Sequence, residues 1–137
     1  MYMTTKPVAV YVFPEGSDSP RRLSAEETET LFEHYKDTGF EPKLEALYKL
    51  CNCDTVELVV LPGLGNLWLD EEGRLKGRKV SPVASVLYQS AIDPDGDIVG
   101  TAVLVVNPEM PASTVDEMFA EMHAVISRYR ARNAHMN

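Results

Sequence analysis

The chain has 137 residues, 45% of them apolar and 25% charged, a composition typical of one soluble globular domain. Its 13 Lys and Arg against 21 Asp and Glu give a formal net charge of −8, which argues against direct nucleic-acid binding and against anionic membranes. No apolar run approaches the roughly 18 residues of a membrane span, and the start lacks a secretory-signal pattern. We therefore expect one cytoplasmic domain over residues 1–137.

The first half of the chain predicts a strand, two helices and a second strand. Their ranges are Val8–Phe13, Ala25–Asp37, Pro42–Leu50 and Thr55–Leu61. Ser24 and Glu27 form a capping-box pattern at the start of the first helix, and Asn52 is a good left-handed terminator for the second. Pro62 and Gly63 then indicate a turn.

The second half predicts a hairpin, a short helix, a strand and a last helix. We expect Asn66–Asp70 to pair with Arg74–Lys76 across the Glu71–Gly73 turn, and Ser81 to cap a helix that reaches about Gln89. The nearly all-apolar run Ile98–Val106 is typical of a central strand. Ser113 or Thr114 should cap the last helix, with residues 131–137 frayed.

Several strands follow one another over short links, so the pattern is not a regular strand–helix alternation. We therefore predict an α+β domain with a mostly antiparallel or mixed sheet of about four to five strands. We expect the helices to pack mainly on one face of that sheet.

No catalytic constellation stands out, and we expect a non-enzymatic protein without metal or cofactor. Cys51 and Cys53 have neither a nearby base nor zinc-ligand spacing, which favours free thiols at the end of a helix. The run Asp93–Asp97 lacks the glutamate of a calcium loop, and Pro62–Asn66 lacks the Lys-Ser/Thr ending of a phosphate loop.

Three surfaces are candidates for binding. Asp70, Glu71 and Glu72, in the predicted hairpin turn, would attract a basic partner protein if other acidic loops lay beside them, although ordinary solubility charge scattered over the surface is the simpler explanation. A ring and a run of cations could instead hold a nucleotide or another small ligand. These residues are Trp68, Arg74, Lys76, Arg78 and Lys79. The last helix carries an apolar stripe that would serve core packing or a homodimer. It includes Met118, Phe119, Met122 and Tyr129.

The stretches LEALYKLCNCDTVELVVL, GNLWLDEEGRLKG, SPVASVLYQ and DIVGTAVLVV lie in order between Leu44 and Val106. In this order they resemble a domain-of-unknown-function family of small proteins encoded by bacteriophages and mobile elements, many of them in actinobacteria. WLDEEGRLKG is the most specific part. The resemblance implies a phage accessory protein in the cytoplasm of its bacterial host. Together with the acidic charge, it favours binding to a host protein, as an inhibitor of host defence or of nucleic-acid processing.

Overall fold

The computed structural model describes residues 9–32 and 42–135, with side chains described as far as residue 128. Five strands form one antiparallel sheet in the order β2-β1-β5-β4-β3. They are β1 (Val10–Phe13), β2 (Arg21–Arg22), β3 (Val56–Leu61), β4 (Gly65–Asp70) and β5 (Ala102–Val106). β5 is buried along its whole length at the centre of the sheet, as its unbroken apolar run predicts.

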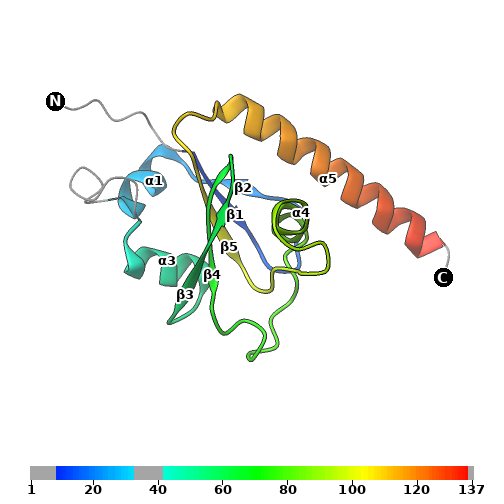
Figure 1. The fold of residues 1–137 in the computed structure, drawn as a ribbon, viewed down its shortest axis with the longest axis horizontal. Coiled ribbons are helices and arrows are strands. Elements are labelled where there is room, and N and C mark those ends of the chain that lie inside the picture. The colour runs from blue at the N-terminus through cyan, green and yellow to red at the C-terminus, as the bar shows by residue number, and fades with distance from the viewer. Residues whose placement is uncertain (1–8, 33–41, 136–137) are drawn as a thin grey trace.

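Helices cover both faces of the sheet. α1 (Ala25–Leu31) and α3 (Leu44–Cys51) lie on one side, and α4 (Pro82–Ala91) and α5 (Ala112–His135) lie on the other (Figure 1). The expectation of helices mainly on one face is therefore wrong. The physical reason is that β1 and β5 are apolar at consecutive positions, so both faces of the sheet must be removed from water.

Neighbouring residues of a strand supply the two halves of the core. Tyr11, Phe13 and Leu104 point toward α4 and α5, where they pack with Phe119. The alternate positions point toward α1 and α3. They are Val10, Val12, Val103 and Val105, which pack with Leu47 and Cys51. The predicted α+β class, with a sheet of five antiparallel strands, is confirmed in the described residues.

The predicted helix starts and ends are confirmed in part, and α5 begins at Ala112, so Ser113 and Thr114 lie inside the helix instead of capping it. Ser24 and Glu27 form the reciprocal capping box of α1, and Asn52 closes α3 in the left-handed conformation. The predicted extension of the first helix to Asp37 lies outside the described residues. α5 continues to His135, so the expected fraying from Ala131 is wrong for the backbone up to that point.

The predicted hairpin is wrong in its partner. β4 pairs with β3 through the tight turn at Pro62–Leu64, and Arg74–Lys76 lies in turns rather than in a strand. Hydrogen bonds between neighbouring backbone groups hold that segment, from Lys76 N–H to Glu72 C=O at 3.1 Å and from Gly77 N–H to Arg74 C=O at 3.1 Å. The segment thus satisfies its backbone locally and does not extend the sheet.

The approach to β5 also differs from the prediction. Ile98 and Val99 precede a bend at Gly100, whose φ of +90° is a conformation that glycine adopts without strain. The strand begins only at Ala102. Ser81 occupies the N-cap position of α4 as predicted. Its side chain does not cap the helix, because the hydroxyl donates to the Phe13 carbonyl at 3.1 Å.

Candidate functional site

Asp70 ends β4 and is buried, so it does not belong to an exposed acidic surface. Its Oδ2 accepts a hydrogen bond from Lys76 Nζ at 3.0 Å and lies 3.6 Å from Arg78 Nε. Its Oδ1 accepts from the Glu72 N–H at 2.9 Å. The side chain therefore organises the 71–79 loop from within.

Glu71 and Glu72 are exposed at the start of that loop. Glu71 lines a hollow of about 220 Å³ together with Glu57 of β3 and Asp97 of the turn that follows α4. Glu72 is not one of the lining residues. Two of the acidic loops noted in the sequence thus meet at one hollow, which the buried Asp70 also lines, and β3 adds the exposed carboxylate of Glu57. We call this site the acidic hollow.

The acidic hollow has an apolar floor and an apolar rim. Leu69, Ile98 and Val99 are buried beneath it, and Tyr88 contributes a partly buried ring. At the rim, Leu75 is 86% exposed, the highest value among the exposed large apolar side chains described. A carboxylate-rich recess with an apolar floor suits a basic side chain that has a long aliphatic stem.

Three of the four predicted ligand-binding cations, Arg74, Lys76 and Arg78, form ion pairs with carboxylates. Arg74 forms an ion pair with Asp97, and Lys76 forms one with Asp70. The hydrogen bond from Lys76 to Asp70 raises the pKa of the Lys76 ammonium. Arg74 lines the acidic hollow, where its charge partly offsets that of Asp97.

Arg78 and Lys79 meet Glu15, which follows β1. Arg78 Nη1 donates to Glu15 Oε1 at 3.0 Å, and the Lys79 N–H donates to Glu15 Oε2 at 2.9 Å. The Lys79 N–H, followed by the Arg78 guanidinium, lowers the pKa of Glu15. Arg78 also donates to the Asn52 carbonyl. The basic run therefore joins the 71–79 loop to β1 and to the end of α3.

Trp68 is not one of the residues that line the acidic hollow with Arg74. It packs with Val56 against the core cluster beside α1 and α3. Its indole Nε1 is buried and has no hydrogen-bond partner among the described residues. Trp68, the predicted stacking ring, and Arg74 therefore do not line the same recess.

The two cysteines are free thiols, as predicted. Cys51 is fully buried in the core cluster beside α3, and burial raises the pKa of its thiol to about 12. Cys53 is partly exposed, and burial followed by the Asp70 carboxylate raises the pKa of its thiol. Both effects suppress the reactive thiolate.

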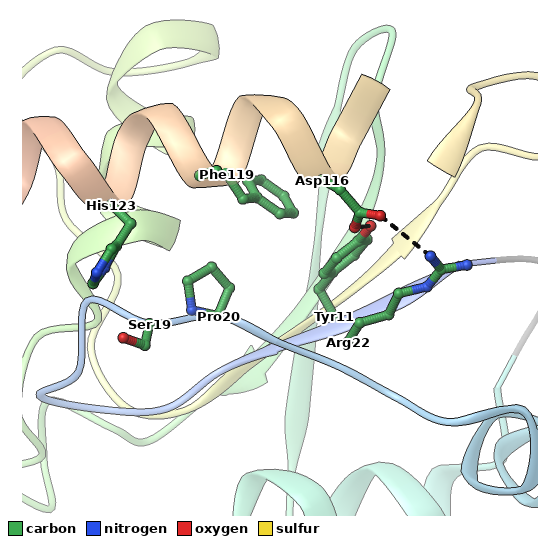
Figure 2. Close-up of a pocket in the computed structure, with 8 residues that line it drawn as sticks. Tyr11, Ser19, Pro20, Arg22, Asp116, Phe119 and His123 are labelled. Carbon is green, nitrogen blue, oxygen red and sulfur yellow. Dashed lines mark hydrogen bonds and ion pairs between the residues drawn. The ribbon is translucent and has the colours of Figure 1, made fainter. Parts of the chain in front are cut away.

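Sequence reasoning missed a second hollow, of about 330 Å³, between β2 and α5. Figure 2 shows its walls, with Pro20 from the β1–β2 connection facing Phe119 and with Arg22 and His123 toward opposite ends. The Tyr11 hydroxyl donates to Asp116, whose other oxygen lies 3.3 Å from Arg22 Nη1. We call this site the β2–α5 groove.

Aromatic packing and a second polar contact complete the β2–α5 groove. The Tyr11 and Phe119 rings meet edge to face at 4.8 Å between centroids. His123 Nδ1 lies 2.8 Å from the Asp18 carbonyl oxygen. Burial, followed by the hydrogen bond to Asp116, raises the pKa of Tyr11. Nothing local in the sequence indicates this site, because Tyr11 and Asp116 are 105 residues apart.

Within the part of the chain that the structure describes, no group of three or more His, Cys, Asp or Glu side chains could hold a metal ion. No helix among those residues is long and apolar enough to cross a membrane. Comparison with protein-family models, curated proteins and solved structures finds no match.

Proposed function

We propose that this protein is a non-enzymatic binding protein that engages a basic segment of a partner protein through the acidic hollow. The observation that carries the proposal is the convergence of Glu57, Glu71 and Asp97 from three separate segments on one recess. Glu57 and Glu71 are exposed, and the whole chain carries a formal charge of −8. A concentrated negative field speeds the encounter with a basic partner and selects against acidic ones.

The identity of the partner follows from the family resemblance and from the charge of the acidic hollow. A phage or mobile-element protein acting in the bacterial cytoplasm would meet host proteins first. Proteins that process nucleic acids present basic surfaces that complement phosphates, and the acidic hollow complements the same surfaces. The proposed role is therefore inhibition of a host defence or nucleic-acid-processing protein.

The test is selection from a library of random displayed peptides on the immobilised full chain. We expect enrichment of peptides rich in Lys and Arg. The enrichment should disappear with the Glu57→Gln/Glu71→Gln double variant. It should persist with Glu26→Gln/Glu29→Gln, a pair of exposed positions on α1 that changes the net charge equally. An absence of basic peptides, or an equal loss with both variants, would contradict the proposal.

A second candidate function is the binding of a small ligand in the β2–α5 groove. Its apolar walls and the flanking Arg22 and His123 suit a planar ring that bears an anionic group, a class that includes nucleotides. Nucleoside monophosphates and aromatic carboxylates should then raise the melting temperature of the wild type more than that of Arg22→Gln. The absence of any stabilisation at high ligand concentration would exclude this function.

A further inference from the structure

β3 is an edge strand with an open outer side. It is the last strand of the sheet, and among the described residues no strand pairs with it on the side away from β4. β3 runs for six residues, whereas β2 at the opposite edge has only two. An edge of this length presents a row of backbone donors and acceptors that fits another extended chain.

One side chain of β3, that of Glu57, carries a charge, and the others leave that edge unprotected. Val59 and Leu61 point into the core cluster under α4 and α5. On the other face, Leu58 is 44% exposed and Val60 is 58% exposed, although both are large and apolar. Proteins commonly protect an open edge with charged side chains, proline or a bulge. The residues Val56–Leu61 include no lysine or proline and pair with β4 without a bulge, and Glu57 is their one charged residue. The Leu58–Val60 face is therefore an apolar strip beside a backbone edge with which no described strand pairs.

The opposite face of the same strand is acidic. Glu57 alternates with Leu58, so it lies on the α4 side, where it lines the acidic hollow with Glu71. A strand added beside β3 would therefore meet apolar side chains on one face and carboxylates on the other. A second copy of β3 would bring two acidic hollows together, and their like charges disfavour that pairing.

We infer that β3 accepts an extended segment of the partner protein as an added strand, with apolar side chains over Leu58 and Val60 alternating with basic side chains toward Glu57 and Glu71. This inference rests on the proposed function and specifies the form of the partner. The main-chain hydrogen bonds supply sequence-independent affinity, and the alternation supplies the specificity. A partner helix would not satisfy the open edge, because its backbone groups bond within the helix.

The probe is a peptide of alternating lysine and valine, about as long as β3, titrated into the full chain at low salt. Two N-methylated forms of the peptide are compared with it. One carries methyl groups on the odd-numbered residues, and the other carries them on the even-numbered residues. Only one edge of an added strand donates hydrogen bonds to β3. One methylated form should therefore bind about a hundredfold more weakly than the unmethylated peptide, and the other less than about threefold more weakly. Equal affinity of the two forms would overturn strand addition.

Protein variants provide a second, independent readout. Val60→Thr keeps the β-branched shape and the strand propensity, and it should weaken binding of the peptide by about threefold to fivefold. Val125→Thr on α5 alters an equally exposed valine, and it should leave the affinity unchanged. Equal effects of the two variants would contradict docking on the Leu58–Val60 face.

The two proposals fail in different ways. If the unmethylated peptide binds, and if Glu57→Gln/Glu71→Gln weakens it while both N-methylated forms bind alike, the acidic hollow is a binding site but strand addition is wrong. If neither this peptide nor any displayed basic peptide binds, the proposed function itself is wrong. A chain that dimerises through β3 without binding the peptide would also overturn the inference.

Discussion

The fully buried carboxylate of Asp70 accepts a hydrogen bond from Lys76 Nζ at 3.0 Å. This contact folds the 71–79 loop back over the end of β4. The loop in turn places Glu71 beside Glu57 and Asp97 at the acidic hollow. The ion pair between Asp70 and Lys76 thus supports the exposed acidic hollow. In the sequence, Asp70 and Glu71 are neighbours, and nothing there distinguishes the buried carboxylate from the exposed one.

Asp70→Asn should destabilise the protein by about 2 to 3 kcal/mol. The change leaves Lys76 and Arg78 without their shared carboxylate, but the Lys76 side chain is a third exposed, so water offsets part of the usual cost of breaking a buried pair. Glu72→Gln, at an exposed neighbouring position, should change the stability by less than about 0.5 kcal/mol. Urea unfolding of both variants checks the prediction, and equal effects would contradict it.

Gly65→Ala should cost at least about 3 kcal/mol or prevent folding. A Cβ atom there would lie 2.2 Å from the Val105 carbonyl oxygen, so the β4–β5 pairing would have to open. Gly63 is the matched control, because its φ of +77° is strained for alanine but nothing lies within 4 Å of the added atom. Gly63→Ala should cost only about 1 kcal/mol, and thermal unfolding that ranked the two variants in reverse would refute this account of the hairpin.

Glu15 should contribute a pH-dependent part of the stability. Its pKa is lowered in the folded protein by the Lys79 N–H and by Arg78. The contribution is therefore fully present above the unfolded value near 4.5, and it disappears as the pH falls through the lower folded pKa. Unfolding measured across this acidic range should show that Glu15→Gln loses less stability than the wild type. Equal loss of stability in Glu15→Gln and in the wild type would contradict the prediction.

Cys51 should resist alkylation in the folded protein. Its pKa of about 12 leaves only about one thiol in ten thousand ionised at pH 8, and the side chain has no access to solvent. Iodoacetamide followed by mass spectrometry should modify Cys53 first, and both thiols should react in denaturant. Rapid native labelling of Cys51 would show that α3 does not pack as described.

The parts of the fold that could be predicted are those with local causes. β5 follows from an unbroken apolar run, and the start of α1 follows from the Ser24–Glu27 capping box. The β3–β4 hairpin could not be assigned, because turn residues stand on both sides of β4. The structure pairs β4 with β3, and in the same arrangement Gly65 lies opposite Val106, which is far along the chain.

The candidate site, like the fold, could be predicted only where its causes are local. Its residue type could be predicted, since acidic loops were evident at Glu71 and Asp97. Their convergence depends on the strand order and on the ion pair between Arg74 and Asp97, which join segments that are far apart in the sequence. The burial of Asp70 depends on the path of the following loop, which carries no periodic pattern.

The most direct test of the acidic hollow is the affinity of the alternating lysine–valine peptide for three proteins under identical low-salt conditions. These are the wild type, Glu57→Gln/Glu71→Gln and the α1 control Glu26→Gln/Glu29→Gln. We expect the first double variant to weaken binding by about tenfold or more and the control to stay within about twofold of the wild type. Equal weakening by both double variants would contradict this expectation, because the peptide would then be responding to net charge and not to this hollow.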